Sequence, residues 1–343
     1  MLKLFQSIFG GNEAHGRYPE SLIEMATERV VDGTYPRLRL QPGYRKRLRQ
    51  PVIHAIDHVI SLIDNLPAPL PAVTAAYSSD PRLPALFVSA EHMREVFAKD
   101  DALSEFRASH PEIGAGVTAL LLAERREKNT LGVELEGDML RRDVAQVTVS
   151  FRNHRLVDPT SSEEEARRQL KRRAFDHLIS LALWRISEAK SERAELNRQH
   201  ELLKGKLSLL QRGGWSFEDK GEESIDPAAL QGEFDTIEAQ LAAITIDDRS
   251  LSGQLDLVIE LLEDAENQLW AEPVELHLDR MNVKRPAENP DARQISFQEL
   301  HNSRGQCLAT LFVSLNPAEL PQSPKFSASS GQILAELGSS LRR

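Results

Sequence analysis

Residues 227–271 carry a heptad pattern that constrains the fold more than any other feature of the sequence. Two rows of positions alternate with spacings of four and three residues, and eleven of their twelve positions are apolar. The rows are Leu230, Ile237, Ile244, Leu251, Val258, Ala265 and Phe234, Leu241, Asp248, Leu255, Leu262, Leu269. Such a pattern is typical of a coiled-coil helix. Because its phase continues across residues 246–250, the sequence predicts one helix up to Pro273, with room for a bend at that point.

A second, weaker heptad pattern precedes the first and supplies a partner helix. Its rows are Phe175, Ala182, Ala189, Leu196, Leu203, Leu210 and Ile179, Ile186, Arg193, His200, Leu207. Ser161 and Ser162 stand three residues before Glu164 and Glu165, in capping-box spacing, and Gly213 and Gly214 end the pattern. We therefore expect an antiparallel coiled-coil hairpin over residues 161–271.

The register of this hairpin places two charged core positions opposite each other. When the apolar rows of the two helices face one another, His200 faces Leu241. In the same register Arg193, the one permanently basic core position, faces Asp248, the one acidic core position. A lone polar pair in a coiled coil can fix alignment without adding stability. Arg193 and Asp248 are thus predicted to be the structural register pair.

The segments on both sides of the hairpin show the two-residue period of half-buried strands. They cover residues 117–123, 131–135, 145–151, 274–278, 295–297 and 307–315. We expect an α+β fold in which six or so short strands form a mixed or antiparallel sheet, interrupted by the long hairpin and preceded by a helical region. The predicted organisation is a helical region with a Pro-rich linker (1–110), a discontinuous β-rich body (111–160 and 272–315), the hairpin (161–271) and a loose tail with a short helix (316–343).

Composition limits the classes of function. The formal net charge of −10 argues against a surface that binds nucleic acid or anionic membrane throughout, although it permits a local basic patch. Cys307 is the only cysteine and shares the parity of Ala309 and Leu311, so we expect a buried, unreactive thiol in a reducing compartment. No apolar run approaches the ~20 residues of a membrane span. The expected location is the cytoplasm, with peripheral attachment to a membrane as a variant.

One basic segment is the strongest candidate for binding phosphate groups. Residues 37–49 contain no acidic side chain, and the basic ones are Arg37, Arg39, Arg45, Lys46, Arg47 and Arg49. They could meet an anionic membrane surface or, less favoured, nucleic acid. The amphipathic turn formed by Leu2, Phe5 and Phe9 would add a second weak membrane anchor. The competing interpretation is a solvated segment that balances acidic residues of the same chain.

A weak metal motif lies in the next predicted helix. His54, Asp57 and His58 form H-x-x-D-H, which approximates the H-x-x-E-H pattern of inverted zinc proteases. Aspartate is one methylene shorter than the required base, no third ligand stands out, and the regularly spaced isoleucines around it also fit an ordinary core-facing helix. No phosphate-binding or nucleophile motif is present, so the sequence indicates no cofactor and assigns no catalytic residue.

The hairpin tip supplies the last candidate. Trp215 and Phe217 stand among glycines at the predicted tip, where they could contact a partner or plug the open end of the hairpin. The leading hypothesis is a non-enzymatic scaffold whose helical arm binds a protein partner or a second copy of itself. Membrane or nucleic-acid attachment through residues 37–49 is the second hypothesis, and a hydrolase with a scattered or metal-dependent site near His54 and His58 is the third.

Overall fold

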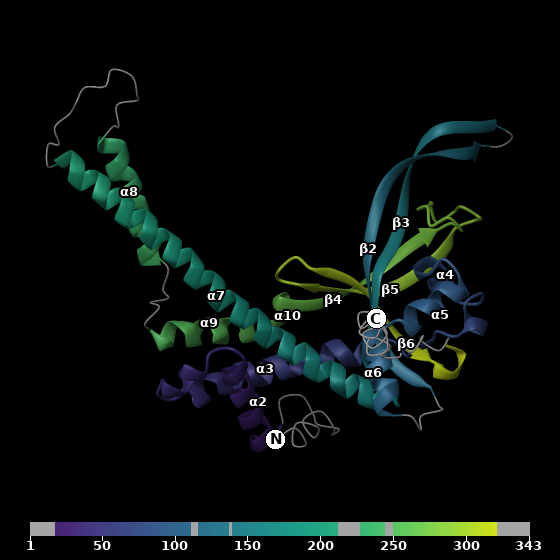
Figure 1. The fold of residues 1–343 in the computed structure, drawn as a ribbon, viewed down its shortest axis with the longest axis horizontal. Coiled ribbons are helices and arrows are strands. Elements are labelled where there is room, and N and C mark those ends of the chain that lie inside the picture. Colours follow the sequence, from purple (N-terminus) through teal and green to yellow (C-terminus); the bar gives the residue numbers. More distant parts are fainter. Residues whose placement is uncertain (1–17, 111–115, 137–138, 212–226, 244–249, 321–343) are drawn as a thin grey trace, which may run out of the picture. The chain divides into compact units, whose positions relative to one another are not determined.

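The structure of the chain is a computed structural model that describes residues 18–110, 116–136, 139–211, 227–243 and 250–320. The fold is α+β, as predicted (Figure 1). The chain divides into two compact units. The helical unit comprises residues 1–63 and 171–269, and the sheet unit comprises residues 64–170 and 270–343.

The helical unit contains the N-terminal helices together with the hairpin. Its elements are α2 (Glu20–Gly33), η1 (Pro36–Leu40), α3 (Tyr44–Asp64), α7 (Glu163–Gln211, from residue 171), α8 (Pro227–Ala243), α9 (Leu251–Glu263) and α10 (Ala265–Gln268). None of the described helices combines the length and apolar character that crossing a bilayer requires.

The N-terminal helices group with the base of the hairpin, whereas the sequence predicted a separate region over residues 1–110. Arg29 Nε and Nη2 on α2 donate hydrogen bonds to the two carboxylate oxygens of Asp176 on α7, each at 2.9 Å. A Cβ added to Gly33 would lie only 2.5 Å from Cγ2 of Ile179, so the end of α2 lies directly on α7. Apolar residues of α3 and α9 are also buried, so both helices are stabilised by packing an apolar face within this unit.

Helix α7 confirms the first predicted arm of the hairpin. It is 49 residues long, and Ser162 Oγ accepts a hydrogen bond from the Glu165 amide at 3.3 Å, as the capping signal indicated. At ~1.5 Å per residue, α7 is about 70 Å long.

The second predicted arm is not one helix, and this part of the prediction is wrong. Helix α8 ends at Ala243, and α9 begins with its own cap, because Ser250 Oγ accepts a hydrogen bond from the Gly253 amide at 3.4 Å. A further break at Asp264 separates α9 from α10. Leu269, the last heptad position, begins a strand. Local capping therefore overrides the continuous heptad phase.

The sheet unit confirms a mixed sheet built from both flanks of the hairpin. Its strands are β1 (Leu70–Pro71), β2 (Val117–Glu136), β3 (Met139–Thr160), β4 (Leu269–Leu278), β5 (Arg293–Asn302) and β6 (Cys307–Leu315). The order is β3-β2-β6-β5-β4, with β1 parallel to β6. Strand β6 pairs antiparallel with β2 and with β5.

Short helices contribute to the core of the sheet unit. They are α4 (Arg82–Leu86), α5 (Ala90–Ala98) and α6 (Asp101–Ser109), and Figure 1 shows them beside the strands. Their buried side chains, among them Met93 and Phe97, form one core with Ala119, Leu121 and Leu311 of the strands. Asp100 supports this packing twice, since its carboxylate caps α6 at Leu103 and accepts a hydrogen bond from the amide of a residue in β3 at 2.8 Å.

Strands β2 and β3 are much longer than the predicted strands. They are 20 and 22 residues long and pair from Thr118 with Thr160 to Glu136 with Met139. Strand β6 accompanies β2 only along residues 117–123, and beyond that point β2 and β3 continue as a ribbon (Figure 1), which Val283 joins through an isolated bridge to Thr148 of β3. The polar run at 124–130 lacks apolar alternation, which is why the sequence predicted two separate short strands instead.

Candidate functional site

The three residues of the weak zinc motif lie on α3, and each contacts a different partner. His54 Nε2 lies 3.0 Å from the Glu266 carboxylate, whereas His58 Nε2 lies 2.7 Å from the carbonyl oxygen of Leu269. Asp57 accepts a hydrogen bond from a tyrosine hydroxyl at 2.5 Å. A carbonyl only accepts, so His58 Nε2 donates to it, and only Nδ1 of this ring keeps a lone pair. Within the described residues these side chains form no ligand cluster, which corrects the zinc hypothesis.

Most of the basic segment is paired within the helical unit. Arg39, Arg45, Arg47 and Arg49 all form ion pairs, while Arg37 and Lys46 are exposed. The pairs are Arg39–Glu28, Arg39–Asp32, Arg45–Glu28, Arg47–Asp256 and Arg49–Glu20. These carboxylates offset the positive potential that phosphate groups would meet. The contacts are those expected of a segment that balances acidic residues of the same chain.

Three of the candidate site residues of the hairpin lie outside the described residues. They are Asp248 and the tip aromatics Trp215 and Phe217. Arg193 is half-buried on α7. The pairing of Arg193 with Asp248 therefore remains a prediction.

One contact between α7 and α8 differs from the predicted register. The ring of His200 stacks on Phe234 with centroids 4.6 Å apart, whereas the heptad alignment placed His200 against Leu241. The difference is one heptad, or about 10 Å along the axis at ~1.5 Å per residue. The predicted register is therefore wrong at this contact. A shift of seven residues keeps every apolar row in place, so the heptad pattern does not distinguish the two alignments.

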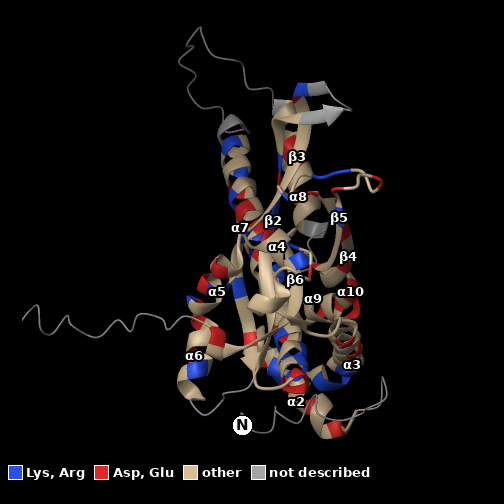
Figure 2. Ribbon diagram, turned by 90° about the vertical axis from the view of Figure 1, so that its right-hand side faces the viewer, with Lys and Arg blue, Asp and Glu red and all other residues tan. Residues whose placement is uncertain are grey.

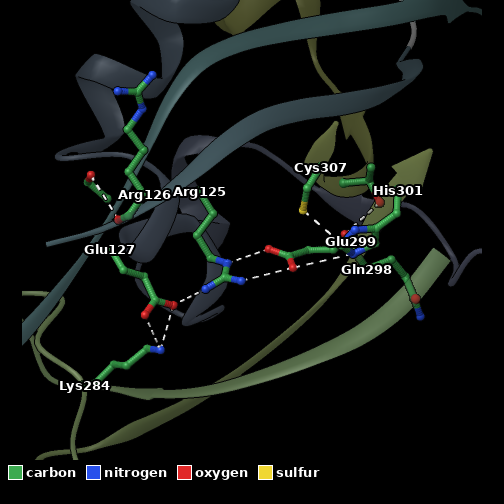
Figure 3. Close-up of polar contacts among 10 residues, drawn as sticks. Arg125, Arg126, Glu127, Lys284, Gln298, Glu299, His301 and Cys307 are labelled. Atoms are coloured by element: carbon green, nitrogen blue, oxygen red, sulfur yellow. Dashed lines mark hydrogen bonds and ion pairs between the residues drawn. The ribbon is translucent and has the colours of Figure 1, made fainter. Parts of the chain in front are cut away.

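A different cluster of reactive groups lies in the sheet unit, where the core face of the sheet becomes polar. In the β5–β6 pair, Glu299 stands opposite Ala309, and His301 stands opposite Cys307. Side chains on paired strands alternate between faces, so Glu299, His301 and Cys307 share the face of buried Ala309. In β2 the partner of Ala309 is Ala123, and Arg125 follows two residues later on the same face. The strand registers thus bring the four side chains together (Figure 3).

A buried ion pair anchors this cluster. Glu299 is only 4% exposed, and its two oxygens accept hydrogen bonds from Arg125 Nε at 2.5 Å and Nη2 at 3.1 Å. Desolvation on its own would raise the pKa of Glu299, but the hydrogen bonds and charge of Arg125 outweigh it and lower that pKa. Arg125 also pairs with Glu127, which binds Lys284 Nζ at 2.7 Å. Figure 3 shows the four charged groups in a chain.

Cys307 and His301 complete the cluster at its exposed edge. Cys307 Sγ lies 3.8 Å from His301 Nε2, and that nitrogen lies 3.9 Å from Glu299 Oε2. The indole of Trp270 stacks on His301 with a centroid distance of 5.4 Å and an interplanar angle of 12°. Cys307 is exposed at the start of β6, which corrects the expectation of a buried residue, because the core ends before this position.

The thiol of Cys307 is held in its protonated form. Partial desolvation and the neighbouring Glu299 carboxylate raise its pKa to about 11. A cysteine nucleophile requires the opposite shift, since the thiolate is the attacking species. The proximity of His301 therefore does not make this pair an acyl-transfer site. What the cluster offers is three different donor atoms within 4.8 Å of one another, from Glu299, His301 and Cys307.

The alternation of side chains along β5 contains a sequence signal for this cluster. Ile295 and Phe297 fixed the buried face of β5, and continuing the same alternation places Glu299 and His301 on that face. Polar groups at positions of buried parity indicate a site or a paired charge. Arg125 carries no such signal, because its partner lies 174 residues away.

Comparisons with protein-family models, with curated proteins and with solved structures found no match to this chain.

Proposed function

We propose that this chain is a non-enzymatic scaffold protein whose helical arm binds a second copy of the chain. The arm is defined here as α8 together with residues 190–211 of α7. The observation that carries the proposal is the incomplete burial of the arm's apolar seam. Leu203 and Leu230 are buried in the seam, while Leu196, Leu207, Phe234, Ile237 and Leu241 remain half-buried. Two helices leave one side of such a seam uncovered, and a second pair can close it as a four-helix bundle.

Charge favours another copy of the same arm as the occupant. Helix α8 carries three acidic residues and no lysine or arginine, whereas residues 190–211 of α7 carry five basic and three acidic residues. Figure 2 shows both kinds of charge along α7. An arrangement that sets α7 of one copy beside α8 of the other brings opposite net charges together. It is therefore favoured over an arrangement that sets α7 beside α7 and α8 beside α8.

The test is the mass of the full chain in solution, measured by light scattering over a range of concentrations. The expected result is a dimer for the native chain and a shift toward monomer for Leu202→Glu. Leu202 lies on the arm and is 60% exposed, so this change leaves the fold of one copy intact. Leu40→Glu is the matched control, because Leu40 is 72% exposed on η1, outside the arm, and this variant should remain a dimer.

Two results would count against the proposal. A native chain that is monomeric at every concentration would remove self-association. Equal dissociation of the Leu202→Glu and Leu40→Glu variants would show that added charge, and not the arm, controls assembly. We further propose a cytoplasmic location, which the single thiol of the chain supports.

A further inference from the structure

We propose that Glu299, His301 and Cys307 bind a thiophilic divalent metal ion, for which zinc is the best fit. The proposal concerns the sheet unit and is independent of the arm. The donor set combines a carboxylate oxygen, an imidazole nitrogen and a thiol sulfur, which are the three ligand types that zinc takes in proteins.

The distances suit a shared ion. Zinc lies ~2.3 Å from sulfur and ~2.0–2.1 Å from nitrogen, so tetrahedral geometry places these two donors about 3.5 Å apart. Cys307 Sγ and His301 Nε2 are 3.8 Å apart, and His301 Nε2 and Glu299 Oε2 are 3.9 Å apart. These two separations lie within about half an ångström of the tetrahedral values, and all three donors lie within 4.8 Å of one another. Three protein ligands leave a fourth position open toward solvent at the exposed edge of Cys307.

Backbone pairing holds the ligands in place. His301 and Cys307 are directly opposed on hydrogen-bonded strands, and Glu299 lies one step along the same face. Asn302 Oδ1 accepts hydrogen bonds from the backbone amides of residues 304 and 306, both at 3.1 Å, which fixes the turn between the strands. The stacked indole of Trp270 limits rotation of the His301 ring. Ligands on a rigid, supported scaffold are the arrangement a metal site needs.

The charges around the donors favour a cation despite Arg125. Lys284 and Arg125 are both engaged by Glu127, and Arg125 leaves each Glu299 oxygen a further lone pair. Glu272, which Trp270 Nε1 binds at 2.8 Å, is a third carboxylate close enough to raise the pKa of the thiol. The three carboxylates and the Cys307 thiolate together carry four negative charges, and Arg125 and Lys284 carry two positive charges. A divalent ion neutralises the remaining excess of two negative charges. The same carboxylates that disfavour a lone thiolate therefore favour a metal thiolate.

Cobalt(II) titration of the full chain tests this site, because a cobalt-bound thiolate absorbs through sulfur-to-metal charge transfer. The chain has one cysteine, so such a band can come only from Cys307. We expect one Co²⁺ per chain, displaced by Zn²⁺, in a buffer with a phosphine reductant.

Three variants separate a built site from a single reactive thiol. Cys307→Ser should abolish the charge-transfer band, and His301→Ala should weaken Co²⁺ binding at least tenfold. His277→Ala is the matched control, since His277 lies on β4 of the same sheet and outside the cluster, and it should bind as the native chain does. Circular dichroism establishes that each variant is folded. Absence of the band in the native chain, or an affinity that His301→Ala leaves unchanged, would overturn the assignment.

Discussion

The buried ion pair between Arg125 and Glu299 allows one stability effect to be worked out in detail. Replacing Arg125 with methionine keeps most of the side-chain volume and leaves the Glu299 carboxylate, 4% exposed, without its charged partner. Breaking a buried pair from one side costs ~3–5 kcal/mol. Because the Arg125 side chain is itself 23% exposed, we take the lower limit, about 3 kcal/mol. For a unit of 150–250 residues this lowers Tm by roughly 6–12 °C.

The pH dependence of this loss has a definite sign. In the native chain the pKa of Glu299 is lowered, so its contribution to stability is present above the pKa of the unfolded chain and is lost as pH falls through the folded value. Without Arg125, desolvation dominates and the folded pKa should rise above the unfolded one. Protonation then favours the folded variant, and the stability difference between Arg125→Met and the native chain should shrink as pH falls from neutrality toward the unfolded carboxyl pKa, ~4.3.

Thermal unfolding followed by circular dichroism at several pH values measures both effects. Arg126→Met is the matched control, because Arg126 is the neighbouring arginine in β2, its side chain is 63% exposed, and its pairing with Glu124 should contribute less than about 1 kcal/mol. The double change of Arg125 and Glu299 to methionine should recover most of the lost stability. A double variant as unstable as the sum of its single changes, with a pH-independent loss, would refute this account.

Three further predictions concern the helical unit. Gly33→Ala should lower the free energy of unfolding by ~1–3 kcal/mol in urea denaturation, because its Cβ would crowd Ile179, and a neutral result would contradict the close contact. Ser250→Ala should cost ~1 kcal/mol, measured in the same way, since it removes the cap of α9; a loss below a few tenths would mean that α9 is capped otherwise. The heptad-shifted contact predicts that a double-mutant cycle of Arg193→Leu and Asp248→Leu shows coupling below ~0.5 kcal/mol, and a larger value would restore the predicted register.

Much of the fold follows from periodicity in the sequence. The capped start of α7, its length, and strands on both flanks of the hairpin were predicted, because apolar period and capping residues act within a few residues of one another. The extension of β2 and β3 into a ribbon could not be found in this way. Backbone hydrogen bonds between the two strands require no apolar alternation in β2, so the polar run at 124–130 hid a continuous pairing.

The candidate metal site illustrates a different limit. Its three ligands come from β5 and β6, and Arg125, which pairs with Glu299, comes from β2, so the strand registers bring these residues to one point. Alternation along β5 places Glu299 and His301 on the buried face, but nothing local to the sequence identifies Cys307 as the residue opposite His301. The contact of Arg125 with Glu299 spans 174 residues and depends on the pairing of β2 with β6, so this part of the cluster becomes visible only with the topology.

The hairpin register shows why heptad matching is weak evidence for alignment. A heptad pattern is unchanged by a slide of seven residues, so apolar matching alone leaves several registers nearly equal in energy. An Arg–Asp pair in a half-covered seam contributes little to the choice, since the cost of desolvating both charges offsets much of their attraction. Stacking of His200 on Phe234 buries apolar area and adds an aromatic contact. Aromatic pairs contribute ~0.5–1.5 kcal/mol of stabilising free energy beyond that of area burial. The ring contact can therefore outweigh the ion pair in setting the alignment.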